Sequence, residues 1–308
     1  MKWLLLILIS LTLLAKTSEE EAAEKVYIAN INALLIFTSE SGLSSGKYSL
    51  TNTGHSIETY SVPFSYHFKP YTKELNFFIN GSSGFSRTRL ELPPKSELTR
   101  SGNDLNLTLD NKIQTYAFGV GGGVRYKVDE GIELLASAGL IYSRVGVSVK
   151  PDNPGEIVEG AFDSAYNDNL TYKFMLSGKY QKEFHHYKPY LKLDIKSYET
   201  KSELDFSSLL NISTQSSVAS FAMGCESLSL YEHGDDYLSL EAYLRGNYLF
   251  GDIVEVVDLY RYANFGLIGY WNTPDLPSWA ERFYLEVSTV RAEGLEGYNV
   301  GIGFSLDY

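Results

Sequence analysis

The final twelve residues of the chain alternate strictly between large apolar residues and small or polar ones. The large residues are Tyr298, Val300, Ile302, Phe304, Leu306 and Tyr308. A period of two residues is typical of a β-strand with one apolar face, because successive side chains of a strand point to opposite sides. An aromatic residue at the end of such a strand favours a membrane strand, since aromatic rings are stable at the level of the lipid headgroups.

The same run resembles the C-terminal assembly signal of Gram-negative outer-membrane β-barrels, in which a polar residue and a glycine precede hydrophobic residues and a terminal aromatic residue. The residues that fit these places are Asn299, Gly301, Phe304, Leu306 and Tyr308. The resemblance implies an outer-membrane location and a barrel-assembly machinery as a partner during biogenesis. The alternative interpretation is an ordinary edge strand at the end of a domain.

The first fifteen residues predict a secretory signal peptide. Lys2 precedes the apolar run 3–14, and Ala15 is a small residue at a candidate cleavage site. The run is too short to span a bilayer comfortably as a helix, and no cysteine follows it for a lipid anchor. Because no later apolar run is longer, we expect an exported protein that would enter a membrane only through strands.

Residues 16–40 form a short N-terminal segment ahead of the predicted barrel. Ser18 and Glu21 have the spacing of a helix capping box, and residues 26–37 continue either as a helix or as a first strand. The segment is acidic through Glu19, Glu20, Glu21 and Glu24.

Residues 41–308 predict an all-β fold, an antiparallel transmembrane β-barrel of about twelve strands. A weak strand is expected at 47–52, after a glycine-rich turn at 42–46. Pro63 indicates a weakly paired place, and the glycines at 81–84 indicate a bulge. The other expected strands are 60–68, 73–90, 116–128, 132–142, 170–181, 187–196, 216–231, 237–250, 262–271, 282–291 and 298–308.

The connections between these strands alternate in length. Short ones are expected near 69–72, 129–131, 183–186 and 232–236, and longer ones near 91–110, 150–169, 200–215 and 251–261. Short turns on one rim and long loops on the other are the plan of outer-membrane barrels, and the pattern puts the C-terminus on the short-turn, periplasmic rim. The layout resembles the solitary autotransporter-like β-barrel family, which implies one barrel without a passenger domain.

Two features favour an apolar face that meets lipid over a soluble barrel with an apolar interior. The ends of the apolar faces are rich in tyrosine, as interfacial girdles are. A soluble barrel of twelve strands would also need an interior filled with apolar bulk.

The opposite face carries a basic strip on two neighbouring strands, made of Lys173, Lys179, Lys188, Lys192 and Lys196. Three interpretations of this lumen-facing strip remain open: a solvated wall, an anion-preferring pore lining, or a docking surface for the acidic N-terminal segment acting as a plug. A run of lumen-facing glycines, Gly119, Gly121 and Gly123, would either curve the strand or leave a groove for a helix. Autotransporter barrels carry a helix in the lumen, and the resemblance makes the plug plausible.

Other function classes are disfavoured. A formal charge of -12 argues against nucleic-acid binding, and Cys225 as the single cysteine excludes a disulfide framework. We find no cofactor motif, no metal site and no catalytic motif of an outer-membrane phospholipase or omptin-like protease; residues 232–236 have suitable residue types, but on the short-turn rim. The sequence therefore predicts a non-enzymatic outer-membrane barrel of structural or narrow-pore role that contacts lipid and lipopolysaccharide. The alternative is a surface adhesion or receptor barrel that acts through its long loops.

Overall fold

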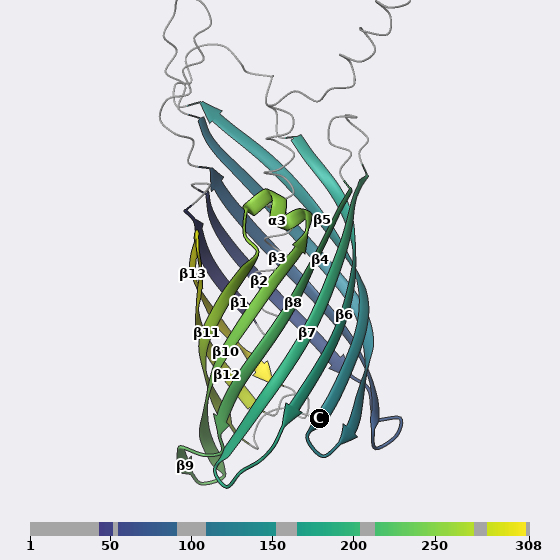
Figure 1. The fold of residues 1–308 in the computed structure, drawn as a ribbon, viewed down its shortest axis with the longest axis vertical. Helices are drawn as coiled ribbons and strands as arrows, with labels where there is room; N and C mark the ends of the chain where they lie inside the picture. Colours follow the sequence, from purple (N-terminus) through teal and green to yellow (C-terminus); the bar gives the residue numbers. More distant parts are fainter. Residues whose placement is uncertain are drawn as a thin grey trace, which may run out of the picture.

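The chain folds into one β-sheet that closes on itself, as the computed structural model shows (Figure 1). The structure describes residues 43–51, 55–90, 109–151, 165–203, 213–273 and 282–305. The predicted signal peptide, the boundary between residues 40 and 41, and the choice between helix and strand at 26–37 all lie outside the described residues.

The sheet contains thirteen strands. These are β1 (Leu43–Leu50), β2 (His55–His67), β3 (Leu75–Leu90), β4 (Leu109–Asp129), β5 (Ile132–Pro151), β6 (Ala165–Gln181), β7 (Tyr187–Glu203), β8 (Ser213–Ser227), β9 (Tyr231–His233), β10 (Asp236–Gly251), β11 (Arg261–Asn272), β12 (Arg282–Ala292) and β13 (Leu295–Ser305). The three-residue β9 pairs with β10 at the rim, so twelve strands form the wall.

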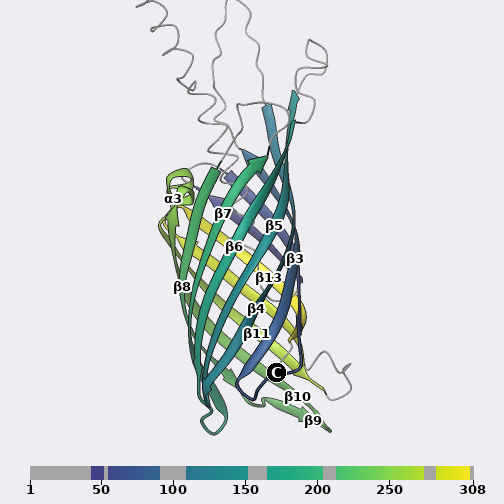
Figure 2. The same ribbon diagram turned by 90° about the vertical axis from the view of Figure 1, so that its right-hand side faces the viewer.

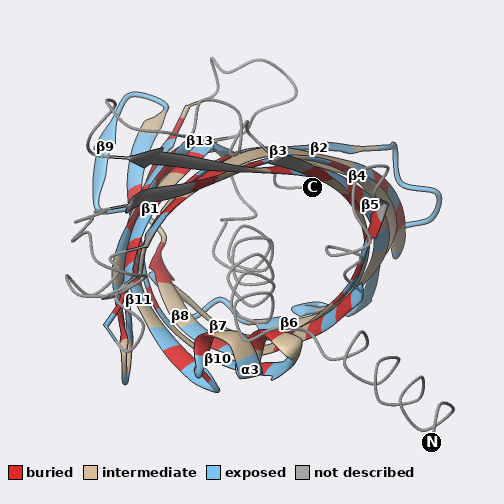
Figure 3. Cartoon of the chain, turned by 90° about the horizontal axis from the view of Figure 1, so that it is seen from above, coloured by how far each residue is buried: buried red, intermediate tan, exposed pale blue. Residues whose placement is uncertain are grey.

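Each wall strand pairs with its sequence neighbours in antiparallel register, and β13 pairs with β1 to close the barrel. The closing register places Leu43 opposite Ile302 and Leu50 opposite Leu295. Seen from above, the strands form a continuous ring (Figure 3). The predicted antiparallel barrel of twelve strands, with the closing strand against the first, is confirmed.

The apolar face of the strands points outward. Large hydrophobic side chains at alternate positions are exposed on every side, with Val120 on β4 at 56% and Leu193 on β7 at 60% exposure. On β5 and β6 this apolar belt runs from Ile132 to Tyr142 and from Tyr180 to Tyr172. About 9–11 residues of a tilted strand cross a bilayer, which matches this height. The fold is thus that of a transmembrane β-barrel, whose apolar face points outward.

The two rims differ, as expected. The turns that end β2, β4, β6 and β8 lie on the rim where β13 also ends (Figures 1 and 2). Most of the long connections on the opposite rim lie outside the described residues, but residues 251–261 include a short helix, α3 (Asp252–Val257). Among the described residues, no helix is both long and apolar enough to cross a membrane.

The alternation of connection lengths is not complete. On the long-loop rim, β12 and β13 are joined by Glu293 and Gly294 alone, and Gly294 has a φ of 77°. Glycine adopts this left-handed conformation without steric cost, which permits so tight a turn. The strands at the closing seam are accordingly shorter than β4 and β5, which have 21 and 20 residues.

Two sequence predictions about glycine are wrong. Residues 43–46 belong to β1 rather than to a turn, and β3 runs through residues 81–84 in unbroken register with β2 and β4. In both places an aromatic ring covers the glycine: a Cβ at Gly46 would lie 2.4 Å from Tyr48 Oη, and one at Gly81 would lie 2.1 Å from Phe64 Cζ. The described register shift lies instead between Lys127 and Asp129. Pro63 pairs with Ser82 on β3, and among the described residues β1 pairs with β2 only up to Ser61, so the weak pairing expected at Pro63 stays a prediction.

Candidate functional site in the barrel lumen

The inner wall of the barrel is polar. Alternation places Ser, Thr and Asn side chains opposite the exposed hydrophobic ones, and many of them are buried. Hydroxyl pairs tie neighbouring strands together, such as Ser44 with Ser61 at 2.7 Å and Thr171 with Thr200 at 2.8 Å. Charged side chains are concentrated on β4 to β8 and β10 to β12, which divides this wall into a basic part and an acidic part.

The predicted basic strip lies on the inner faces of β6 and β7. Lys173 and Lys179 alternate with the exposed Tyr172, Phe174 and Tyr180, and Lys188, Lys192 and Lys196 alternate with the exposed Leu191, Leu193 and Ile195. The strand register makes Lys179 and Lys192 direct cross-strand partners. Like charges directly opposite each other destabilise a sheet, so this pair costs the fold free energy.

Two lysines of the strip, Lys188 and Lys192, have a described carboxylate nearby. Lys192 Nζ lies 3.2 Å from Asp194 Oδ2, and Lys188 Nζ lies 3.7 Å from Glu183 Oε2. Lys179 Nζ lies 5.4 Å from the centroid of the Tyr190 ring, a cation–π arrangement without an anion. Arg125 on β4 adds a further cation and pairs with Glu133 on β5 at 3.3 Å. The described inner face of β4 to β7 therefore carries more cations than anions.

A cavity of about 210 Å³ opens on this basic side. Its lining includes Arg125, Lys173, His67 and the amide of Asn80. Two cations and an amide donor suit a small anion, because both guanidinium and ammonium groups bind oxyanions through charge-assisted hydrogen bonds.

Of the three lumen-facing glycines of β4, Gly119 lines this cavity. A Cβ at Gly123 would lie 2.3 Å from the carbonyl oxygen of Ala136, and one at Gly121 would lie 2.7 Å from that of Ala138. The backbone of β5 thus leaves no room for a side chain at Gly121 or Gly123. This contact favours the curvature interpretation of the glycines over a groove for a helix.

The adjoining part of the inner wall, on β7, β8 and β10 to β12, holds an acidic network that sequence reasoning missed. Glu241 on β10 accepts hydrogen bonds from the hydroxyls of Tyr190 on β7 at 2.6 Å and Tyr270 on β11 at 2.7 Å. Glu286 on β12 accepts one from Tyr243 on β10 at 2.5 Å. Because the bonds from Tyr190 and Tyr243 each cross an intervening strand, the network braces the wall from inside.

A third glutamate completes this network. Glu226 on β8 pairs with the guanidinium of Arg282 on β12 and accepts a hydrogen bond from Ser239 Oγ at 3.0 Å. The Arg282 guanidinium also lies 3.7 Å from the centroid of the Tyr270 ring. The three glutamates are single acids in separate strands, and only the strand register brings them together. In the sequence, each of these glutamates is an acidic residue at an inward-facing position of a strand.

An apolar cluster lies on the inner side of the wall at the long-loop rim, beside the seam. Its members are Tyr48, Leu50, Ile57, Val218, Leu249, Ile253, Val257, Leu259, Tyr262, Val290 and Leu295. Helix α3 contributes Ile253 and Val257 from above, next to β10 (Figures 1 and 3).

Asn299 and Gly301 are buried on the inner face of β13, and Phe304 is exposed outside, 5.7 Å from Phe283 between ring centroids. Leu306, Tyr308 and the acidic residues Glu19, Glu20, Glu21 and Glu24 lie outside the described residues. In the described part of the chain, no group of three or more His, Cys, Asp or Glu residues is arranged to hold a metal ion.

No protein-family model matches this sequence, and no curated protein matches it either. Solved structures do match. The β-domain of the Bordetella autotransporter BrkA is 11% identical, with a TM-score of 0.57 over 86% of this chain and all of that one. The translocator domain of NalP from Neisseria meningitidis is 10% identical, with a TM-score of 0.51 over 94% and 97% of the two chains. The transport unit of AIDA-I from Escherichia coli is 11% identical, with a TM-score of 0.50 over 94% and 98%. At such identities the likeness concerns the fold, and it confirms the predicted resemblance to autotransporter-like outer-membrane barrels.

Proposed function

We propose that this chain is an integral outer-membrane β-barrel whose lumen is a narrow, anion-preferring pore. The observation that supports the proposal most strongly is the juxtaposition of Lys179 and Lys192 on the inner wall. A purely structural wall gains nothing from like charges at direct cross-strand positions. A pore lining does gain, because rings or strips of lysine and arginine attract anions and repel cations.

The surroundings of this lysine pair fit the same role. The cavity lined by Arg125 and Lys173 provides a second position for an anion along the basic wall. An anion that enters along β4 to β7 would therefore pass cations in succession, which is the arrangement that conduction requires.

We further propose that the acidic N-terminal segment regulates this pore as a plug. Strand β1 begins at Leu43, opposite Ile302 and well inside the barrel height, since six residues of β2 continue past the last β1–β2 pair at Ser61. The preceding segment would thus reach the wall close to the lumen. Glu19, Glu20, Glu21 and Glu24 are complementary in charge to the basic strip.

Planar-bilayer recordings of the full chain and of a variant that lacks residues 18–37 test both proposals. We expect a small or intermittent current from the full chain and a steady, anion-preferring current from the variant. Equal currents from the two proteins would overturn the plug and leave the pore. The absence of current from both would overturn the pore.

A second candidate is a surface adhesion or receptor barrel. It is favoured by the length of β4 and β5, of 21 and 20 residues, because about half of each strand suffices to cross a bilayer. The extra length would raise the connecting loops above the membrane surface. A protein that conducts no current in either form but binds to host or bacterial surfaces would support this candidate instead.

The location and partners follow from the same proposal. Residues 1–15 would direct export, the barrel-assembly machinery would read the closing strand, and the apolar belt would contact outer-membrane lipid and lipopolysaccharide. Recovery of the protein only as soluble periplasmic material would contradict this location.

A further inference from the structure

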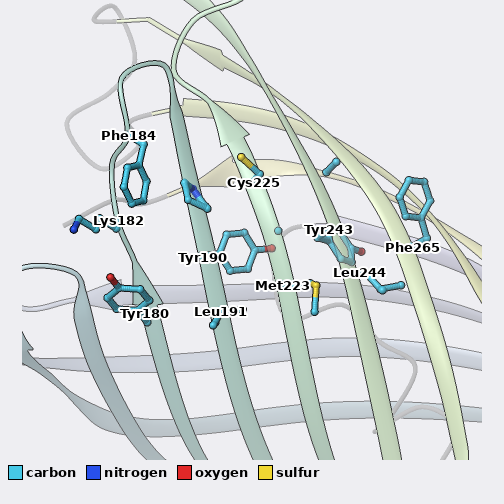
Figure 4. A pocket seen from close by; sticks show the side chains of 13 residues that line it. Tyr180, Lys182, Phe184, Tyr190, Leu191, Met223, Cys225, Tyr243, Leu244 and Phe265 are labelled. Carbon is cyan, nitrogen blue, oxygen red and sulfur yellow. The ribbon is translucent and has the colours of Figure 1, made fainter.

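An apolar hollow lies on the outer face of the barrel near the short-turn rim, and we call it the lipid groove (Figure 4). It has a volume of about 560 Å³ and spans the outer surface of β6, β7, β8, β10 and β11. Its lining includes Pro189, Cys225 and Ala242. Figure 4 shows two further lining residues, Tyr180 and Phe265, on either side of Cys225. Such a volume is in the range of about 300–1,000 Å³ that small-molecule ligands occupy.

The strand register creates this hollow. Pro189 is the cross-strand partner of Cys225, and Cys225 is that of Ala242, so three small outward-facing residues stand in one row across three strands. The next position along β8 is Gly224, where a Cβ would lie 2.6 Å from the Tyr190 ring on the inner side. The rings of Tyr190 and Tyr243 therefore close the floor from within.

The lumen network fixes that floor in place. Tyr190 is held by its hydrogen bond to Glu241, and Tyr243 by its hydrogen bond to Glu286. A preformed hollow loses little conformational entropy when a ligand fills it. The lipid groove is thus a built feature of the wall rather than a gap between mobile side chains.

A cation stands at the periplasmic end of the lipid groove. Lys182 lines it, and its Nζ lies 5.2 Å from the centroid of the Phe184 ring in the adjoining turn. The neighbouring carboxylate, Glu183, is directed at Lys188 instead. Within the described ranges, no carboxylate forms an ion pair with Lys182, so its charge is available to an anion at the membrane interface.

A second hollow on the outer face provides a comparison. It has a volume of about 540 Å³ on β4 to β7 and is lined by residues such as Ala136, Ala138, Phe174 and Ile195. No charged side chain is among its lining residues. Size and apolarity are shared by the two hollows, whereas a cation at one end belongs to the lipid groove alone of the two.

We infer that the lipid groove binds one phospholipid of the inner leaflet, with an acyl chain along Pro189, Cys225 and Ala242 and the phosphate on Lys182. The charge complementarity between an ammonium group and a phosphate at headgroup level identifies this occupant. The inference rests on the proposed location of the barrel in an outer membrane, whose periplasmic leaflet would face the short-turn rim.

Native mass spectrometry of the detergent-purified full chain tests the inference. The protein is reloaded with phosphatidylglycerol, or with diacylglycerol as the matched lipid without a phosphate, and collisional activation then strips weakly held molecules. We expect one phosphatidylglycerol to remain at energies that remove all diacylglycerol. The variants are Lys182→Ala, which removes the cation, Lys182→Arg, which restores it, and Ala242→Phe, which fills the lipid groove. Ala138→Phe fills the second hollow and is the control.

Lys182→Ala and Ala242→Phe should each reduce the retained fraction at least fivefold, whereas Lys182→Arg and Ala138→Phe should keep it. Equal retention by Ala242→Phe and the wild type, or an equal loss in Ala138→Phe, would overturn the inference. Heat-modifiable gel migration of every variant verifies the folded barrel. A barrel that reaches the outer membrane and retains no lipid would refute this inference alone, whereas a soluble periplasmic protein would refute the proposed function.

Discussion

Tyr190 on β7 donates its hydroxyl to Glu241 on β10 across the intervening strand β8, at 2.6 Å inside the lumen. The other oxygen of the same carboxylate accepts from Tyr270 on β11 at 2.7 Å. One buried acid thus links three strands that are not all neighbours. Lys192 lies on the same strand as Tyr190 and pairs with Lys179 on β6, so the braced acidic part of the inner wall adjoins the basic part.

Removal of the Tyr190 hydroxyl should weaken this brace. Tyr190→Phe keeps the ring over Gly224 but leaves one oxygen of a buried carboxylate without its donor, at a cost of about 1–3 kcal/mol. The temperature at which the fast-migrating folded band is lost on gels should fall. Tyr187→Phe, on the exposed outer side of the same strand, is the control. Equal stability of the two variants would contradict the role of the brace.

Two glycines of β11 should respond differently to alanine. A Cβ at Gly266 would lie 2.4 Å from the Tyr243 ring, whereas one at Gly269 would meet nothing within 4 Å. Gly266→Ala must displace the ring and with it the hydrogen bond to Glu286, so we expect a destabilisation of about 1–3 kcal/mol. Gly269→Ala should be within about 0.5 kcal/mol of the wild type. Urea unfolding of the two variants in detergent micelles measures the difference, and a reversed order would refute the packing argument.

A salt bridge above the outer tyrosines should give the barrel a pH-dependent stability. Arg144 donates two hydrogen bonds to Asp168 at 2.7 and 3.0 Å. Arg144 is the next outward-facing residue of β5 after Tyr142, so the pair lies beyond the apolar belt. The guanidinium lowers the pKa of the Asp168 carboxyl below its ordinary value. The stabilisation is therefore complete above the unfolded pKa of about 3.9 and is lost as the pH falls through the lower folded pKa.

Compared with Asp168→Asn, the wild type should melt at a slightly higher temperature near neutral pH, and the difference should vanish in strong acid. Because the pair is largely exposed, the difference should be small and should shrink with added salt. A difference that grows as the pH falls would contradict the assignment.

The closing strand offers a test of assembly. Phe304 and Phe283 contact each other on the outer face, so replacing either with alanine removes the same ring contact from the folded barrel. If the closing strand is an assembly signal, Phe304→Ala should reduce the amount of heat-modifiable protein in the outer-membrane fraction severalfold more than Phe283→Ala. Equal reductions would assign Phe304 a packing role only.

Much of the fold could be predicted from the sequence because each wall strand has two chemically different faces. The alternation of tyrosine and leucine with lysine and serine locates strands such as β6 and β7 directly. The errors fall at Gly46 and Gly81, where glycine suggested a turn or a bulge. There the decisive contact is a ring that covers the glycine, and such a contact is not visible in local sequence.

The candidate site was predictable only in part. Within each of two adjacent strands, the lysines of the basic strip are spaced by an even number of residues. The sequence alone therefore shows that the lysines of each strand share one face. The pairing of Lys179 with Lys192 and the meeting of Glu226, Glu241 and Glu286 depend on strand register and barrel closure. A one-residue shift of register would have separated these groups, and periodicity alone does not fix the register.

The reversal potential of the conducting barrel across a KCl gradient tests the proposed anion-preferring pore most directly. We expect the barrel that lacks residues 18–37 to prefer chloride, and joint replacement of Lys173, Lys179, Lys192 and Lys196 by glutamine to abolish that preference. The control is Lys201→Gln, because Lys201 lies on the outer face and pairs with Glu199 at 3.0 Å. A cation-preferring barrel, or a chloride preference that survives the four replacements, would contradict a pore whose anion preference comes from these lysines.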